Sequence, residues 1–210
     1  MKSRIHTLWG KRVIVLGLLL LSLATGALWL DGQQSQLADK MVRLHVLANS
    51  DSDEDQALKL QVRDAVLKTA EPLLAQAGQV DNATGILENN LEQLTAVAQE
   101  TIYREGWDYP VSVQLEETWF PTREYDSFAL PAGSYQALRV VIGEGNGHNW
   151  WCVVFPPLCL ASASETVSQT AQDAGMTDQE VALIAEEDEK YVIKFKAIEL
   201  WEEFKHDFLG

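Results

Sequence analysis

The chain has 210 residues, of which 47% are hydrophobic, and it carries 16 basic against 31 acidic residues. Its formal net charge of −15 at pH 7 excludes a general affinity for nucleic acid, anionic lipid headgroups and anionic wall polymers, because all of these repel an acidic surface. The length excludes a chain of several domains. After a short N-terminal segment, about 180 residues remain, which suffice for one hydrophobic core and are too few for two.

The N-terminal segment is typical of a targeting sequence. Four basic residues precede the run from Val13 to Leu30, which is eighteen residues long and contains no charge. Positive residues before an apolar run hold that end in the cytoplasm and send the following chain across the membrane. The first part of the run has the length of a signal-peptide core and is followed by the small residues 24–26, whereas the whole run reaches about the minimum length of a membrane span. We therefore expect residues 1–30 to be a signal peptide or a signal-anchor, and to be the only part of the chain that contacts the membrane.

The charge of the exported part follows from this division. Four of the 16 basic residues and none of the 31 acidic ones lie in residues 1–30, so residues 31–210 carry 12 basic against 31 acidic residues, a balance of −19. No internal repeat or low-complexity run divides this part. We therefore expect a single extracytoplasmic domain over residues 31–210.

The first elements predicted in this domain are a strand and a long helix. Residues 42–48 alternate apolar and polar side chains, as in a half-buried strand. Ser52 is a typical N-cap, and apolar residues at spacings of three and four predict an amphipathic helix from Asp53 to about Ala77. Pro72 lies inside this helix and predicts a kink or a break into two pieces.

The acidic residues at the start of this helix resemble the first half of a calcium-binding loop. Asp51, Asp53 and Asp55 have the required spacing. However, Gln56 stands where such a loop has glycine, and Val62 stands where it has a bidentate glutamate. Helix capping explains the same residues, because negative charge is favourable near a helix N-terminus. The sequence therefore predicts a capped helix here and no metal site.

Two short apolar runs later in the chain look like a hairpin. Gln136–Ile142 and Trp150–Phe155 are rich in Val, Ile and Trp, and the segment GEGNGHN between them contains three glycines. Glycine reaches positive φ without steric cost, so we expect a wide hairpin loop. Pro156-Pro157 ends the second strand, because proline cannot donate to a strand ladder.

The remaining patterns complete an α+β fold. A second apolar stripe from Leu87 to Ile102 indicates a helix that ends at Gly106. Paired helices followed by clustered strands predict a single α+β domain, with a mainly antiparallel sheet packed by two or three helices. The other predicted elements are strands at 109–120 and 124–130, a surface loop or weakly formed helix at 161–177, a helix at 178–187, a strand at Tyr191–Lys196 and a closing helix at 198–208.

Cys152 and Cys159 are the two cysteines of the chain. In an exported protein they form a disulfide or remain as two inert buried thiols. The alternatives are a Cys152 nucleophile activated by His148, or a metal site that combines His148, both cysteines and another histidine. Residues four apart on a strand are separated by about 13 Å, and no fourth ligand stands at a recognisable spacing. The residues alone therefore favour a structural role for the two sulfurs.

Two blocks of the sequence resemble a known family. Val42–Leu67 (VRLHVLANSDSDEDQALKLQVRDAVL) and Leu130–Cys159 (LPAGSYQALRVVIGEGNGHNWWCVVFPPLC) are similar to the stage II sporulation protein R family of endospore-forming bacteria, and the N-terminal export segment agrees with it. The resemblance implies a signalling protein that is made in the forespore and exported into the space between forespore and mother cell. There it triggers a membrane-embedded aspartic protease that removes the pro-sequence of sigma-E. The family provides no catalytic residue to carry over, so we expect neither an enzyme nor a bound cofactor.

For the contact with this protease we expect polar and aromatic residues of two loops, because binding groups concentrate in loops. Adjacent tryptophans on a strand point to opposite faces, so one of Trp150 and Trp151 should be exposed and available to a partner. The alternative function is an extracytoplasmic thiol- or metal-dependent hydrolase that uses His148 and Cys152. The expected contact residues are His45, Asn49 and Asp51 around the end of the first strand, and His148, Asn149 and Trp150 at the hairpin tip.

Overall fold

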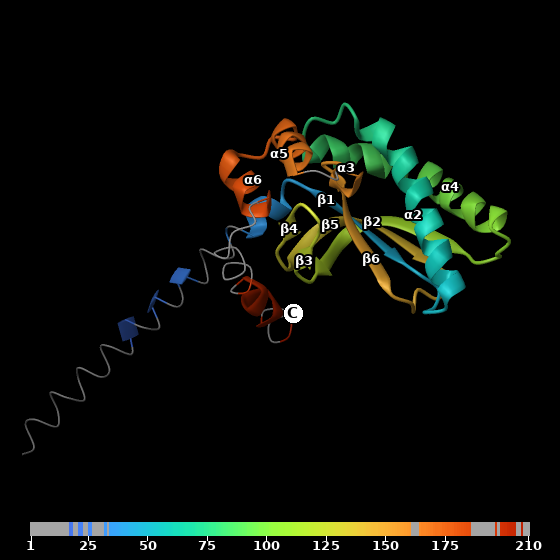
Figure 1. Ribbon diagram of the computed structural model, residues 1–210, viewed down its shortest axis with the longest axis horizontal. Helices are drawn as coiled ribbons and strands as arrows, with labels where there is room; N and C mark the ends of the chain where they lie inside the picture. The colour runs from blue at the N-terminus through green and yellow to red at the C-terminus, as the bar shows by residue number, and fades with distance from the viewer. Residues whose placement is uncertain are drawn as a thin grey trace, which may run out of the picture.

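A four-stranded sheet forms the centre of the computed structural model (Figure 1). The structure describes residues 34–160 and 164–185, together with 17–18, 21–22, 25–26, 32, 196, 198–204 and 207. β5 is parallel to β1, whereas the β1–β6 and β2–β5 pairs are antiparallel. The predicted α+β class with a mainly antiparallel sheet is confirmed. In the order β2-β5-β1-β6, the strands are β2 (Val111–Phe120), β5 (Gly133–Ile142), β1 (Val42–Leu47) and β6 (Asn149–Phe155).

β1 lies in the interior of the sheet, and all six of its residues are buried. Arg43 and His45 alternate with the apolar residues of β1 and lie on one face of the sheet, where aromatic side chains cover them. The guanidinium of Arg43 lies 4.0 Å from the ring centroid of Phe120 and donates a hydrogen bond of 2.8 Å to the hydroxyl of Tyr125. Aromatic rings and a hydroxyl thus replace water around this cation. The polar positions of β1 therefore belong to the interior.

β5 and β6 do not form the predicted hairpin. β1 lies between them and pairs with both, so the segment 143–148 crosses the end of β1. The N–H of Gly147 in this crossover donates to the carbonyl of Ala48 at 3.0 Å. A Cβ at Gly147 would lie 2.1 Å from the carbonyl oxygen of Ser50, so the crossover can approach this closely only with glycine. The hairpin prediction is wrong because a strand about ninety residues earlier in the chain supplies the pairing partner of both runs.

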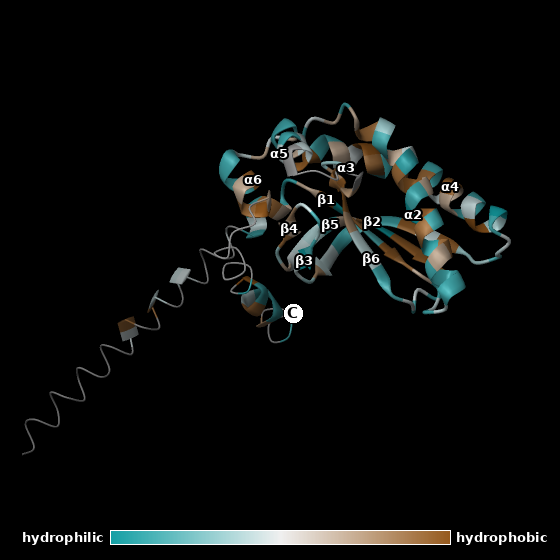
Figure 2. Ribbon diagram, viewed as in Figure 1, coloured by the Kyte–Doolittle hydropathy of each residue, from teal (hydrophilic) through white to brown (hydrophobic). Residues whose placement is uncertain are grey.

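Three helices cover one face of the sheet. They are α2 (Asp53–Leu74), α3 (Val80–Asn89) and α4 (Leu91–Arg104). Figure 2 shows hydrophobic residues on the central strands and both hydrophobic and hydrophilic residues on α2 and α4, as expected of amphipathic helices. The core between helices and sheet includes Leu58, Val62, Val66, Leu94, Ala98 and Ile102 from the helices, and Val42, Leu44, Val46, Leu138 and Val140 from the strands.

The start of α2 confirms the predicted cap, but its end differs from prediction. The hydroxyl of Ser52 accepts a hydrogen bond of 3.2 Å from the N–H of Asp55. The helix continues past Pro72 to Leu74, so the predicted break into two pieces is wrong. Pro72 lacks the N–H that would donate to the carbonyl of Lys68, and only two helical residues follow it, so the helix ends soon after this missing hydrogen bond.

The second predicted helical stripe is divided between two helices. α3 ends at Asn89 and α4 begins at Leu91, with Asn90 between them in a non-helical conformation. α4 ends as predicted before Gly106, which has a φ of +86°. Glycine adopts this left-handed conformation without steric cost, which makes it the usual residue after a helix.

Shorter elements cover part of the opposite face. β3 (Arg123–Glu124) and β4 (Ala129–Leu130) pair with each other, so the strand predicted at 124–130 is a small two-stranded ribbon. After β6 come η1 (Leu158–Leu160), α5 (Ser164–Asp173) and α6 (Asp178–Ala185). α6 confirms the helix predicted at 178–187, and α5 lies within the segment predicted as a loop or weak helix. Their core includes Leu37, Met41, Phe120, Leu130, Tyr135, Val153, Val167, Ala171 and Ile184.

Parts of both ends lie outside the described residues. The predicted strand Tyr191–Lys196 lies outside the described residues except for Lys196, which is helical. Residues 198–204 of the predicted closing helix are helical. Most of residues 1–30 are not described, and no helix within the described part combines the length and hydrophobicity of a membrane span.

Candidate functional site

The loops after β1 and before β6 meet at one end of the sheet. The carboxylate of Asp51 accepts a hydrogen bond of 2.6 Å from the backbone N–H of His148 and lies 2.5 Å from Nδ1 of its ring. Asn49 accepts a hydrogen bond of 3.0 Å from the backbone N–H of Glu144 through its side-chain oxygen. We call Asn49, Asp51, His148, Asn149 and Trp150 the loop cluster. The structure therefore brings together five of the six predicted contact residues.

The loop cluster is anchored to the start of α2 through Asp55. One carboxylate oxygen of Asp55 accepts hydrogen bonds from Asn49 at 2.8 Å and from Ser50 at 2.6 Å. Burial acts to raise the pKa of Asp55, but the hydrogen bonds from Ser50, Asn49 and Tyr109 outweigh it, so the net effect is a lowered pKa. An ionised and nearly buried carboxylate thus fixes the course of the loop after β1.

Lys59 binds the backbone of the loop before β6, a role that the sequence did not predict. Its side chain is only 5% exposed as part of α2, and its ammonium donates to the carbonyl of His148 at 2.9 Å and to Gln56 at 2.5 Å. Burial lowers the pKa of Lys59, because it disfavours the charged form. The sequence does contain a signal, since Lys59 falls on the same helix face as the buried residues Asp55 and Val62.

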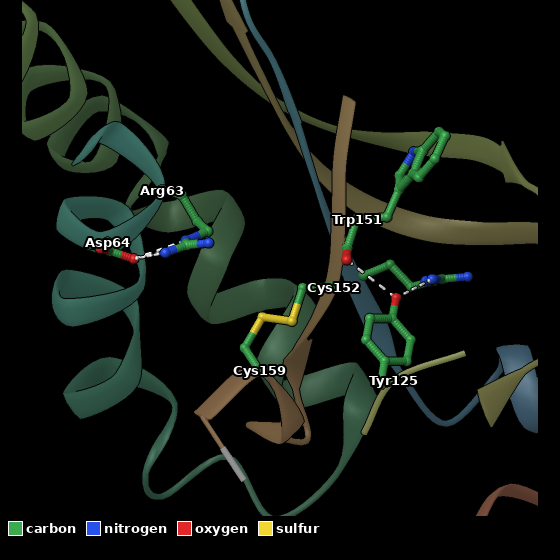
Figure 3. Close-up of a disulfide and its surroundings, with 7 residues drawn as sticks. Arg63, Asp64, Tyr125, Trp151, Cys152 and Cys159 are labelled. Atoms are coloured by element: carbon green, nitrogen blue, oxygen red, sulfur yellow. Dashed lines mark hydrogen bonds and ion pairs between the residues drawn. A yellow bond between two sulfur atoms is a disulfide. The ribbon is translucent and has the colours of Figure 1, made fainter. Parts of the chain in front are cut away.

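The two tryptophans point to opposite sides of β6, as predicted. Trp150 is 37% exposed, and the guanidinium of Arg63 lies 4.2 Å from its ring centroid. Trp151 is half-buried on the other face, under the guanidinium of Arg123 at 3.7 Å. In Figure 3 the side chains of Trp151 and Cys152 leave β6 on opposite sides, and the hydroxyl of Tyr125 reaches the carbonyl of Trp151. Trp150 is therefore the exposed aromatic of the pair.

His45 does not belong to the exposed loop cluster. Its side chain is buried, with ring centroids 5.8 Å from that of Phe120 and 5.9 Å from that of Trp151. Burial lowers the pKa of His45 to about 4; a hydrogen bond with Asn149 acts in the opposite direction, and the neighbouring cations Arg139 and Arg43 lower the pKa further. His45 is buried because the face of β1 on which it lies is covered by aromatic side chains.

Cys152 and Cys159 form a disulfide that ties η1 back to β6 (Figure 3). Neither sulfur is then a free thiol, and the ring of His148 is engaged with Asp51. The predicted structural reading of the two cysteines is confirmed in its disulfide form. Among the described residues, no group of three or more His, Cys, Asp or Glu side chains is placed to hold a metal ion.

The comparisons with known proteins cover the same part of the chain as this fold. A family model described as stage II sporulation protein R matches residues 38–165, which include the four-stranded sheet, the loop cluster and the disulfide. The stage II sporulation protein R of Bacillus subtilis (strain 168) is 40% identical over 134 residues, which are 64% of this chain and 60% of that protein. No solved structure matches the chain. A family model that extends over more than half of the chain, together with this relative, shows that the chain belongs to the stage II sporulation protein R family.

Proposed function

We propose that this protein is an exported signal of endospore formation, which activates the membrane-embedded aspartic protease that processes pro-sigma-E. It acts in the space between forespore and mother cell, either secreted or anchored by residues 13–30. The family supports a role in sporulation, and its relative in Bacillus subtilis carries the name of a sporulation protein. The activation step and the protease as partner are part of the proposal.

The observation that carries the proposal is the loop cluster. The side chains of His148 and Asp51 are 78% and 55% exposed, yet backbone hydrogen bonds and the buried Asp55 and Lys59 fix their positions. A surface that is ordered before binding loses little conformational entropy when a partner docks. Exposed Trp150 adds the type of aromatic side chain that often dominates binding energy.

Activation requires that this surface bind the active form of the protease better than the inactive form. A shift from 1% to 99% active requires about 5.5 kcal/mol of differential affinity. A few central side chains can supply such an amount, because single hot-spot residues contribute about 2–4 kcal/mol. The polar and aromatic residues of the loop cluster are sufficient in number for this.

The test is reconstitution in a host that does not sporulate. The full chain is produced together with the protease and pro-sigma-E, and processing of pro-sigma-E is followed by immunoblot. We expect processing that depends on this chain, and we expect Asn149→Ala/Trp150→Ala to abolish it while export and folding persist. Tyr103→Ala, which removes another exposed aromatic side chain from α4, is the matched control and should process normally.

Two results would contradict the proposal in different ways. Full processing with Asn149→Ala/Trp150→Ala would refute the loop cluster as the contact surface while leaving activation intact. No processing with the unaltered chain, shown to be exported and folded, would refute activation of the protease by this chain alone.

A further inference from the structure

The two edges of the sheet differ in how well they are protected. At the β6 edge, the hydroxyl of Tyr125 caps the carbonyl of Trp151 at 3.2 Å, and the disulfide folds Cys159 back onto the strand. The pairing of β6 with β1 also contains a register shift, and the strand stops at Phe155 before two prolines. Such irregularities and prolines are the usual means by which proteins prevent further strands from adding.

β2 forms the other edge and lacks these features. It pairs with β5 over ten consecutive positions without a register shift, and it contains neither proline nor lysine. Within the described part of the chain, no strand pairs with its outer side. A long, regular edge of this kind is a template for an added strand.

The register identifies the backbone groups that point outward. The N–H of Gly143 donates to the carbonyl of Pro110 at 2.8 Å, which makes these two residues a hydrogen-bonded pair. Hydrogen-bonded and non-bonded pairs alternate in an antiparallel ladder. The backbone groups of every second residue of β2 therefore point away from β5, and these residues are Val111, Val113, Leu115, Glu117 and Trp119.

The negative charge beside this edge favours a strand that carries positive charge. Glu117 borders a groove of about 660 Å³, and none of the basic residues that the structure describes lines that groove. A second copy of this chain is disfavoured, because β2 contains two glutamates and no basic residue, so two β2 strands offer each other no opposite charge, and each copy has a net charge of −15. A strand that carries lysine or arginine meets the complementary potential. The acidic residues that line the groove are Asp39, Asp81, Glu117 and Glu202.

We propose that the outer edge of β2 binds an extended peptide segment with basic side chains, which pairs with β2 as a fifth strand. Alternate residues of the segment lie against Val113 and Leu115 on the helix side of the sheet, and a basic residue enters the acidic groove beside Glu117. β5 and β1 separate this edge from β6, so it is a second surface, distinct from the loop cluster. The inference concerns binding alone and does not depend on the proposed activation of a protease.

The test uses the full chain and a synthetic ten-residue peptide of alternating valine and lysine. Amide hydrogen exchange of residues 111–120 is followed by mass spectrometry with and without the peptide. We expect the peptide to slow exchange of the outward N–H groups among these residues about tenfold, as a new strand hydrogen bond of ordinary strength would do, and to leave the N–H groups already bonded to β5 unchanged. A peptide with glutamate in place of lysine should have no effect.

Two variants at one position separate strand pairing from simple charge attraction. Glu117→Ala removes the carboxylate and keeps the outward N–H, whereas Glu117→Pro removes both, at a site where proline breaks no bond to β5. We expect Glu117→Pro to bind the lysine peptide about tenfold more weakly than Glu117→Ala. Equal binding by the two variants would overturn the proposal, because attraction without pairing predicts it.

Further outcomes also decide the question. If Glu117→Pro does not fold, the unaltered chain is titrated with a lysine peptide that is N-methylated at alternate residues. Loss of protection supports strand pairing, and unchanged protection refutes it. Slow exchange of the outward N–H groups of Val113, Leu115 and Glu117 in the free chain would show that the edge is already covered and would overturn the proposal. Protection that rises with protein concentration in the absence of peptide would assign the edge to a second copy instead.

Discussion

Removal of the disulfide tests whether Cys152 and Cys159 have a structural role alone. The bond joins residues seven positions apart, and the chain-entropy relation for a loop of this size gives about 2.5 kcal/mol of stabilisation. Cys152 is also 3% exposed and packs in the main core, so its replacement by alanine removes a buried sulfur and adds about 1 kcal/mol. We therefore expect Cys152→Ala/Cys159→Ala to be destabilised by about 3–4 kcal/mol.

Urea unfolding of the purified chain measures this quantity, and reduction of the unaltered chain provides the control. Dithiothreitol should lower the free energy of unfolding of the unaltered chain by about 2.5 kcal/mol, because it opens the loop without removing the sulfurs. It should have no effect on the double alanine variant, which should still support pro-sigma-E processing. If the variant and the oxidised chain agree within about 0.5 kcal/mol, the assigned magnitude is wrong. Loss of processing in a folded variant would reopen a chemical role for the thiols.

Three further predictions concern the groups that hold the loops and the buried face of β1. Because folding lowers the pKa of Asp55, its contribution to the free energy of unfolding is present above pH 3.8, the pKa in the unfolded chain, and is lost as the pH falls through the lower pKa of the folded state. Asp55→Asn should lower the free energy of unfolding by about 1–3 kcal/mol at pH 7, as measured by urea unfolding. Burial lowers the pKa of His45 from 6.5 to about 4, so the unfolded chain takes up the proton first, and up to about 3 kcal/mol of stability should disappear between these pH values. His45→Phe should remove this part of the pH dependence. Gly147→Ala should lower the thermal midpoint, because its Cβ would lie 2.1 Å from the carbonyl oxygen of Ser50.

Each of these predictions has a control or a contradicting result. An Asp55→Asn variant whose acid unfolding follows the same curve as the unaltered chain would show that Asp55 is not preferentially ionised in the fold. A pH dependence that persists in His45→Phe between pH 6.5 and 4 would assign it to other groups. Gly85→Ala is the control for Gly147→Ala, because nothing lies within 4 Å of its added Cβ in α3, and alanine there should be neutral or stabilising.

The sequence predicts local elements well where one physical signal dominates. The cap at Ser52 and the end of α4 before Gly106 follow from short-range hydrogen bonding and backbone geometry, and the structure contains both. The alternation of β2 also predicts a strand that is buried on one side. These features depend only on neighbours within a few residues.

The predictions fail where distant parts of the chain meet. Arg43 and His45 make β1 look half-exposed, yet both are buried, because Phe120, Tyr125 and Trp151 arrive from later segments to cover them. The sequence also does not indicate that β1 lies between β5 and β6, so those two strands, which follow each other in the chain, are predicted as a hairpin. No local pattern contains this information.

The candidate site shows the same division. The residues of the loop cluster could be chosen because polar and aromatic side chains stand in loops. Their mutual contacts could not be foreseen, since Asp51 and His148 are 97 residues apart in the chain. Lys59 was missed for a related reason, because a lysine on a helix is ordinarily solvated, and only the crossover of 143–148 gives it a buried acceptor.

The interior position of β1 has a consequence for how the chain folds during synthesis. Arg43 pairs with Ala137 on one side and with Val153 on the other, so both neighbours of the first strand are made about 90–110 residues later. At about 5–20 residues per second, β1 remains without either partner for roughly 5–20 s. Contacts between such distant segments slow folding, because the intervening loop must close before they form. The sheet is therefore completed late, only after both β5 and β6 have been made.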